Sequence, residues 1–370
     1  LTQYPECRNS KGKRGPCPPA QFEGTDCVLY RNNGNGTFTN VSKEAGIVHD
    51  VKGKALGVVA LNLDDEGGRR LTDIFVACDT VPNFLFKNLG DGKFEALSAA
   101  CGCLVNADGT PQAYMGVDAD DLDGDGRPDL FVTAFQHETS TFFRNEGRLQ
   151  FLDATKGTGL GPASWNRLKF GTCLVDLDHD GSLDIVVVNG HVSRNVDDEG
   201  DPEETFRQQA QVFLNSDGKG HFKELSRQAG PYFSERHVGR GLAWCDYDND
   251  GHADLAFNNS GEPAVLLHNE SKTPYHWLRL ELRGTKSNRD AVGAKVIVHV
   301  ANKKFVRQRK GGGSYCSSSD PRLLVGVGPA QLVDSVEIRW PSGLNQQVGP
   351  LKADQGYRIT EGSDKVEARP

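Results

Sequence analysis

This 370-residue sequence contains a single methionine and no apolar run of about 18 residues, the length that a membrane-spanning helix needs. Positive charge is also in short supply, because Asp and Glu outnumber Lys and Arg and leave a formal net charge of −8. The motifs GxSxG, HExxH and the P-loop are all missing. These absences argue against a membrane span, a nucleic-acid partner and the common hydrolase and nucleotide-binding classes, and we expect a protein that is not an enzyme.

Glycine, in contrast, is abundant, with 43 residues, and no segment has a convincing helical period. Many glycines with few long helix formers indicate turn-rich β structure. At this length, two domains are the natural expectation.

A hairpin motif recurs along the first three quarters of the chain. It pairs an asparagine with a nearby Gly and a closing Phe, as in Asn32 to Phe38 and Asn88 to Phe94. Each copy predicts two short strands joined by a turn in which glycine supplies the positive φ. The anchoring asparagines are Asn32, Asn88, Asn145, Asn215 and Asn269.

An acidic motif, Asp-x-Asp-x-Asp-Gly-x-x-Asp, alternates with the hairpins and lies between small apolar strands. The two motifs together give roughly four strands per repeat, which is typical of a β-propeller because one such sheet must stack on its neighbours. A β-solenoid is the alternative architecture, although its repeats are usually shorter.

Each intact acidic loop offers carboxylates at positions 1, 3, 5 and 9 and a backbone carbonyl at position 7, while glycine at position 6 allows the turn. Hard oxygen donors in this arrangement favour Ca²⁺ over Mg²⁺. An EF-hand is the weaker interpretation, because these loops close with Asp at position 9 and are flanked by strands. Solvated acidic turns are the simpler interpretation of any single copy. The three predicted ligand sets are Asp121, Asp123, Asp125, Arg127 and Asp129; Asp176, Asp178, Asp180, Ser182 and Asp184; and Asp246, Asp248, Asp250, His252 and Asp254.

A stretched version of the acidic loop precedes these three. Asn62, Asp64, Glu66 and Asp73 would form a fourth candidate Ca²⁺ site if the intervening residues 67–72 looped out. Four divalent ions would cancel the formal charge of the chain.

The predicted fold is therefore all-β, a propeller of about five blades followed by a small antiparallel β-sandwich. The first blade is incomplete, because residues 27–41 supply only an outer hairpin. The expected division is a Cys-containing tail at 1–25, the propeller at 26–275 and the terminal β domain at 276–370.

The alternating motifs resemble the FG-GAP/VCBS repeats of integrin α-type propellers. Strings such as Asn189-Gly-His-Val192 are similar to the cartilage acidic protein family, especially its bacterial members, and Val333–Gly343 resembles part of an ASPIC/UnbV domain. The resemblance implies a secreted propeller with calcium loops and a C-terminal β domain. It adds little about activity, because the molecular role of that family is mostly unassigned.

Nine cysteines leave at least one thiol unpaired within the chain. Cys7, Cys17 and Cys27 lie in or beside a tail that cannot form a core, so disulfides there would fit an extracellular or cell-surface location. The pair Cys101 and Cys103 is another candidate for a disulfide. Four N-glycosylation acceptors, weak evidence on their own, fit the same location: Asn35, Asn40, Asn258 and Asn269.

Two functions remain open on the sequence. The first is a calcium-stabilised structural, adhesion or self-assembly module, a filament component included, whose partners are other extracellular proteins or copies of itself. The second is a carbohydrate-binding or carbohydrate-processing protein that takes glycans at the propeller face.

Overall fold

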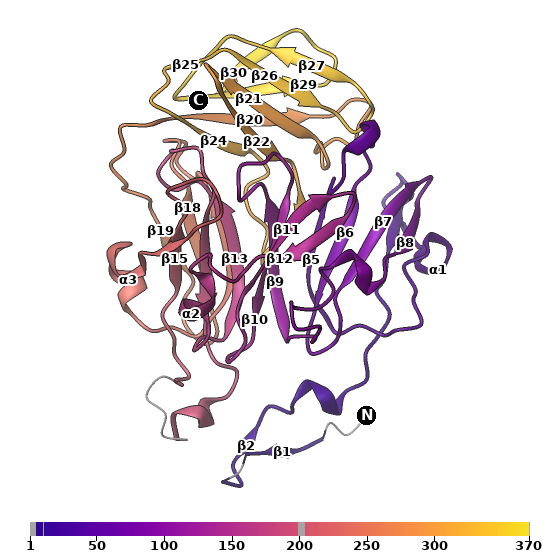
Figure 1. Ribbon diagram of the computed structural model, residues 1–370, viewed down its shortest axis with the longest axis vertical. Coiled ribbons are helices and arrows are strands. Elements are labelled where there is room, and N and C mark those ends of the chain that lie inside the picture. The colour runs from indigo at the N-terminus through magenta and orange to yellow at the C-terminus, as the bar shows by residue number, and fades with distance from the viewer. Residues whose placement is uncertain (1–4, 10, 199–203, 370) are drawn as a thin grey trace.

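The computed structural model describes residues 5–9, 11–198 and 204–369, and nearly all regular structure in them is β. Figure 1 shows a row of upright sheets with a second β domain above them. The three short α-helices, α1 (Ser42–Ala45), α2 (Leu160–Ser164) and α3 (Pro231–Ser234), lie in connections between sheets. Among the described residues no helix has the length and apolar character needed to cross a membrane.

Four sheets follow the sequence repeat, and we call them blades 1 to 4. The chain forms each blade from its innermost strand outward. Blade 1 contains β5 (Ala55–Leu61), β6 (Asp73–Cys78), β7 (Phe84–Gly90) and β8 (Lys93–Ala96). Blade 2 contains β9 (Tyr114–Asp120), β10 (Asp129–Ala134), β11 (Thr141–Gly147) and β12 (Gln150–Asp153). Blade 3 contains β13 (Lys169–Val175), β14 (Asp184–Asn189), β15 (Gln211–Leu214) and β16 (Lys223–Glu224).

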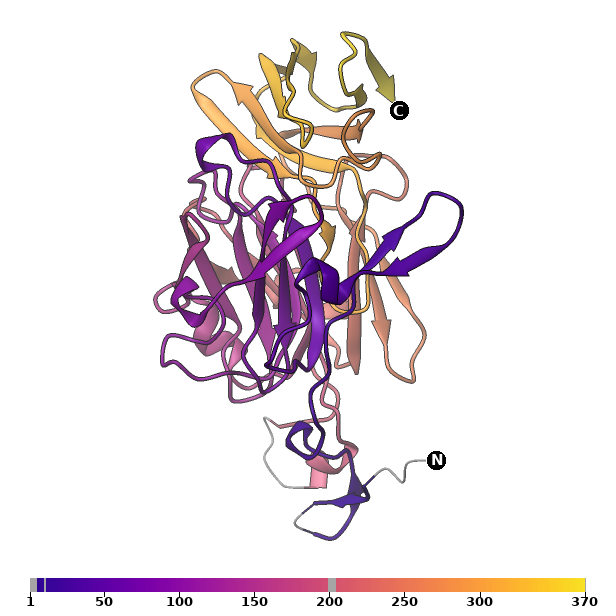
Figure 2. The same cartoon turned by 90° about the vertical axis from the view of Figure 1, so that its right-hand side faces the viewer.

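Blade 4 has only three strands, β17 (Gly239–Cys245), β18 (Asp254–Asn259) and β19 (Val265–Leu267). After β19 the chain passes directly into the terminal domain. At the other end of the row, β3 (Tyr30–Asn32) and β4 (Phe38–Asn40) pair only with each other in the part of the chain that the structure describes. This hairpin stands away from the blades (Figure 2). It is the isolated outer hairpin that the sequence predicts.

Glycine allows the innermost strands of neighbouring blades to pack closely. A Cβ added to Gly57 would lie 2.4 Å from the carbonyl oxygen of Met115, and one added to Gly116 would lie 2.2 Å from that of Phe170. Both distances are too short for any side chain, so the repeated glycine is required by backbone contact between blades. Apolar residues then fill each junction, for example Phe75, Leu130 and Phe143 between blades 1 and 2.

The terminal domain is a two-sheet sandwich with its own core around Trp340. One sheet has the order β24 (Leu323–Gly328), β20 (His276–Arg283), β29 (Gln355–Thr360), β30 (Val366–Arg369). The other has the order β22 (Lys303–Gln308), β21 (Lys295–Val300), β26 (Ser335–Arg339), β27 (Asn345–Val348). The expectation of a purely antiparallel domain is wrong at one pair, because β20 and β29 run parallel. A further two-stranded ribbon pairs β25 (Leu332–Val333) with β28 (Leu351–Lys352).

Residues 310–320, which we call the central segment, leave the terminal domain and run along the innermost strands of all four blades. β23 (Gly311–Gly312) joins blade 1 as a fifth strand beside β5. Ser314 pairs with Val117 of blade 2, and its hydroxyl donates to the carbonyl of Leu242 in blade 4. The backbone N–H of Thr172 in blade 3 donates to the same hydroxyl. The central segment thus ties the blades together on their inner side.

The N-terminal tail carries a disulfide between Cys7 and Cys17, next to the short strands β1 (Cys7–Arg8) and β2 (Arg14–Gly15). The other seven cysteines are free thiols, and Cys27 does not join a bridge. Cys101 and Cys103, a predicted disulfide candidate, are buried thiols with sulfur atoms 3.7 Å apart.

Glu361 fastens the end of the terminal sandwich. Its carboxylate accepts hydrogen bonds from the backbone N–H groups of Thr285, Lys286 and Ser287 at 2.7 to 2.8 Å, and from the Ser287 hydroxyl. Burial alone would raise the pKa of Glu361, but these bonds and one from the Ser342 hydroxyl outweigh it and lower the pKa to about 2.

We therefore expect Glu361→Gln to lower the free energy of unfolding by roughly 3 kcal/mol at neutral pH, because each pKa unit is worth about 1.4 kcal/mol. A lowered pKa in the fold means that this stabilisation is full above the unfolded pKa, near 4.5, and is lost as the pH falls toward 2. Urea unfolding at several pH values tests this. The difference from wild type should shrink in acid, and Glu23→Gln, at an exposed position of the tail, should show no such difference.

Candidate metal sites in the acidic loops

Three of the loops that join the first and second strands of a blade bring carboxylates together. In each loop, oxygen atoms of positions 1, 3 and 9 lie within 4.8 Å of one another. The predicted ligands that meet in this way are Asp121, Asp123 and Asp129 in blade 2; Asp176, Asp178 and Asp184 in blade 3; and Asp246, Asp248 and Asp254 in blade 4.

Positions 5 and 7 belong to the turn of each loop. In blade 3 the Asp180 carboxylate accepts the backbone N–H of Ser182 at 2.7 Å, and the equivalent bonds join Asp125 to Arg127 and Asp250 to His252, both at 2.8 Å. Position 5 of blades 2 and 3 lies outside the tight groups of carboxylates. The Arg127 guanidinium in addition contacts Asp125.

The carboxylate at position 9 is held by its own blade. In blade 3, one oxygen of Asp184 accepts the N–H of Leu177 at 2.9 Å and the other accepts the N–H of Asn215 at 3.0 Å. Asp129 and Asp254 accept equivalent pairs of bonds. Backbone N–H groups of its own blade thus fix this carboxylate within 4.8 Å of those at positions 1 and 3.

The asparagine of the hairpin motif has a role that the sequence did not reveal. The Asn145 side-chain amide donates to the carbonyl of Leu63 in the preceding blade, at 2.9 Å, and to Pro128 in its own. The Asn215 amide donates in the same way to Leu122, and that of Asn269 to Leu177. The repeated Asn thus joins each acidic loop to the loop of the preceding blade. Asn269, a predicted glycosylation acceptor, is used in this bond.

Burial disfavours the ionised form of these carboxyl groups when no cation is bound. Desolvation, with further help from neighbouring carboxylates, raises the pKa of Asp121 and of Asp176 to about 7, and it raises the pKa of Asp184 well above its usual value. One oxygen of Asp176 and one of Asp246 are buried without a hydrogen-bond partner. A divalent cation bound by the three carboxylates would satisfy those oxygens and favour the ionised forms. The donor sets of blades 2 to 4 therefore fit a metal ion.

The stretched loop of blade 1 is different. The Arg69 side chain donates to both oxygens of Asp73, at 2.8 and 2.5 Å, and to the carbonyl of Asn88 at 2.7 Å. Asp73 keeps the position-9 framework, since it accepts the N–H groups of Leu63 and Asn88. An internal guanidinium thus neutralises the carboxylate that would otherwise face an ion.

The remaining predicted ligands of blade 1 do not form a group. Glu66 pairs with Arg148 of blade 2 at 2.6 Å, and Asp64 accepts the N–H of Glu66 at 3.1 Å. Asn62 donates to the carbonyl of Arg69 at 3.2 Å. The expectation that residues 67–72 merely loop out missed Arg69, the one residue in them that returns to the carboxylate.

His268 is a further residue that the sequence did not single out. Its Nε2 lies 3.2 Å from Asp248 and 3.3 Å from Asp250, so it joins the outer side of the blade 4 loop. It precedes the hairpin asparagine Asn269, and the corresponding residues of blades 1 and 2 are Lys87 and Arg144. Blade 3 has Leu214 at this place, so the basic residue shared by the other three blades is the signal that could have found it.

The terminal domain lies on the acidic loops. Each position-6 glycine faces one of its apolar side chains, and a Cβ added to Gly251 would overlap the Trp277 ring at 1.8 Å, while one added to Gly181 would overlap Phe305 at 2.1 Å. Gly126 faces Val306 more loosely, at 3.7 Å. In blades 3 and 4, glycine is therefore needed at position 6 for docking as well as for the turn.

Charged and polar contacts reinforce this docking. Arg279 of β20 pairs with the buried Asp246, and Arg307 of β22 donates to the carbonyl of Gly181 at 2.9 Å. The backbone N–H of Gly326 donates to Asp176 at 3.1 Å, and Lys295 pairs with Asp65 in the blade 1 loop at 2.8 Å. These contacts place basic side chains of the terminal domain against the acidic loops.

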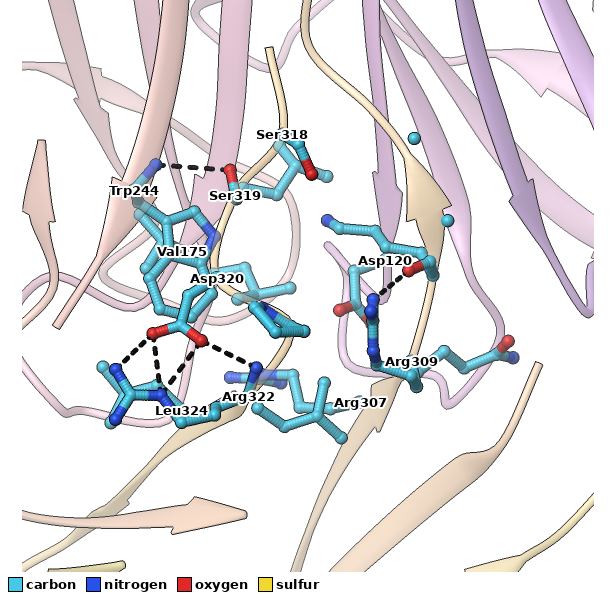
Figure 3. A pocket seen from close by; sticks show the side chains of 18 residues that line it. Asp120, Val175, Trp244, Arg307, Arg309, Ser318, Ser319, Asp320, Arg322 and Leu324 are labelled. Carbon is cyan, nitrogen blue, oxygen red and sulfur yellow. Dashed lines mark hydrogen bonds and ion pairs between the residues drawn. The ribbon is translucent and has the colours of Figure 1, made fainter. Parts of the chain in front are cut away.

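A small cavity of about 80 Å³ remains where the central segment meets the innermost strands. Figure 3 shows Asp320 pairing with Arg322, and the backbone N–H of Trp244 donating to the Ser319 hydroxyl at 3.2 Å. Nearby, Lys310 pairs with Asp118 at 2.5 Å. These contacts hold the central segment in place.

Comparisons with known proteins agree with this architecture. Residues 68–132 and 121–187 match the FG-GAP-like repeat model, and residues 284–366 match the ASPIC and UnbV model. The predicted combination of FG-GAP-type repeats and an ASPIC/UnbV domain in an all-β chain is therefore confirmed.

Similar proteins include cartilage acidic protein 1 of Xenopus tropicalis, 25% identical over 344 residues, which are 90% of this chain and 48% of that protein. The Homo sapiens protein of the same name is 26% identical over 82% of this chain and 43% of its own length. The chain thus spans about half the length of these curated relatives. A solved structure of an Agrocybe aegerita lectin that recognises non-reducing terminal N-acetylglucosamine aligns at 17% identity with a TM-score of 0.34, over 67% of this chain and 76% of that one.

Proposed function

We propose that this chain is an extracellular structural module, not a catalyst, in which Ca²⁺ ions in three acidic loops lock the blades to each other and to the terminal domain. The observation that carries the proposal is the convergence of three carboxylates, two of them buried, in each of these loops, directly beneath the docked domain. The module would act by presenting its rigid surfaces to other extracellular proteins or to copies of itself.

Calcium is favoured by the chemistry of the donors. Carboxylate oxygens at positions 1, 3 and 9, an additional carboxylate at position 5 and a carbonyl at position 7 suit the high coordination number and flexible geometry of Ca²⁺, whereas Mg²⁺ keeps several waters and tolerates such crowded sites poorly. The disulfide between Cys7 and Cys17 supports an oxidising compartment, which secretion would provide.

The position of the Arg69 guanidinium in the blade 1 loop lets us predict the number of Ca²⁺ ions bound per chain. We expect three tightly bound Ca²⁺ ions per chain, because within the described residues the carboxylates of positions 1, 3 and 9 converge in three loops, whereas Arg69 takes both oxygens of Asp73 in the fourth. Elemental analysis by mass spectrometry after desalting measures this number.

Asp178→Asn should reduce the count to two, because it removes one of the grouped carboxylates of blade 3. Asp364→Asn, at an exposed position outside the loops, should leave it at three. A wild-type count of zero would contradict the proposal, and a count of four would contradict the role assigned to Arg69.

A further inference from the structure

We infer that blade 4 is an acceptor for a β-strand carrying one phenylalanine, and that the strand it takes is β4 of a second copy of this chain. This inference deepens the proposed function and rests on its self-assembly part. It follows from comparing how the fourth strand of each blade is held.

In blades 2 and 3 a phenylalanine is buried in an apolar socket. In blade 2 it lies within the fourth strand, and in blade 3 it comes directly before that strand. Phe151 is 6% exposed and Phe222 is 7% exposed. The backbone at each phenylalanine also lies against a glycine of the preceding blade, since a Cβ on Gly102 or Gly159 would approach the carbonyl oxygen of Phe151 or Phe222 within 1.9 or 2.2 Å. The socket of Phe222 is made by Leu183, Ile185 and Phe213 of its own blade and Leu122, Phe142 and Leu160 of the preceding one.

Blade 4 has the same socket without a phenylalanine. The pairing of Leu255 with Leu267 repeats that of Ile185 with Phe213, so the two sockets are in register. A cavity of about 560 Å³ lies there, and a Cβ on Gly230 would have nothing within 4 Å. Its lining includes Ala253, Leu255 and Leu267 of blade 4 and Leu177, Val212 and Pro231 of the preceding repeat.

The β3–β4 hairpin has the complementary property. Phe38 occupies the sequence position of Phe94 and Phe222 in its repeat, yet it is 61% exposed, and Tyr30 is 60% exposed. Within the described residues this hairpin has no inner strands, and an isolated two-stranded hairpin is marginally stable in water. The chain thus holds a fourth strand without a socket and a socket without a fourth strand.

Strand exchange joins the two. If β4 leaves β3 and pairs through the same edge with β19, the side chain of Phe38 keeps its face of the sheet and points into the socket beside Gly230. The exposed edge of β19 supplies the backbone partners. Because donor and acceptor are different surfaces, the contact is heterologous, and it builds a chain of subunits unless the rotation closes a ring.

The test uses sedimentation velocity of the whole chain in Ca²⁺ over a wide range of concentrations. We expect the wild type to form larger species as concentration rises, whereas Phe38→Ser and Leu267→Trp, which remove the donor side chain and fill the socket, stay monomeric. Phe22→Ser, at another exposed phenylalanine (41% exposed), should assemble like the wild type. Phe38 is exposed, so Phe38→Ser decides the question even if Leu267→Trp folds poorly.

Mixing the two variants sharpens the test. Phe38→Ser retains the socket and Leu267→Trp retains the donor strand, so the mixture should form a 1:1 complex that grows no further. A wild type that is monomeric throughout, assemblies that persist in both variants, or a mixture without complex would each overturn the inference. The proposed calcium function is tested independently of assembly. Phe38→Ser should bind as many Ca²⁺ ions as the wild type, and Ca²⁺ should raise its melting temperature by the same amount.

Discussion

Chelation of divalent cations should lower the melting temperature of this protein by roughly 15 °C or more. An ion present at about 100 times its dissociation constant stabilises the folded state by about 2.7 kcal/mol, so three such ions contribute about 8 kcal/mol. For a domain of propeller size, each kcal/mol shifts the melting temperature by about 2 °C or more. The reason is structural: each loop holds three carboxylates within 4.8 Å, and these repel one another when no cation lies between them.

Calorimetry in Ca²⁺ and in EGTA measures this effect, and a loop variant assigns it. Asp178→Asn should lose about one third of the stabilisation by Ca²⁺, because Asp178 belongs to one of three equivalent groups. Asp364→Asn, exposed and outside the loops, is the matched control. Equal melting temperatures in the two buffers, or equal losses in the two variants, would show that the loops are solvated acidic turns.

The repeat made much of the fold predictable. Hairpin and acidic motifs alternate in a fixed order, and each motif contains its own turn chemistry, so the strands of blades 1 to 4 follow from local sequence. The acidic motif predicted a group at positions 1, 3, 5 and 9, and the structure brings positions 1, 3 and 9 together. The isolated hairpin β3–β4 was equally predictable from the sequence, because it is a hairpin motif without an acidic loop before it.

Contacts between distant segments were not predictable in this way. Arg69 lies inside a segment without a motif, and only the fold shows that its side chain returns to Asp73. The amide of Asn215 reaches Leu122, 93 residues away, across a blade junction. The terminal domain meets the acidic loops through Trp277 and Arg279, whose sequence context identifies a strand but no partner. Such contacts depend on how whole sheets stack, and a sequence pattern with a period of one blade does not contain that information.

Arg279 and Asp246 form a buried ion pair between the terminal domain and blade 4, and Arg279→Met should lower the free energy of unfolding by about 3 to 5 kcal/mol in EGTA. Arg279 is 3% exposed and Asp246 is fully buried. Removing one partner of a buried ion pair leaves the other charge without compensation. The loss should be smaller in Ca²⁺, because the ion in the blade 4 loop would still neutralise Asp246, whose other oxygen has no hydrogen-bond partner.

Denaturant unfolding of both proteins in both buffers forms a thermodynamic cycle between the ion and the arginine. Arg283→Met is the matched control, since Arg283 lies on the same strand β20 with an exposed side chain and should cost little in either buffer. If the loss for Arg279→Met is the same with and without Ca²⁺, ion and guanidinium act on separate structures. If the loss is larger in EGTA, the acidic loop of blade 4 is the shared element, and calcium binding stabilises the junction between the blades and the terminal domain as well as the blades themselves.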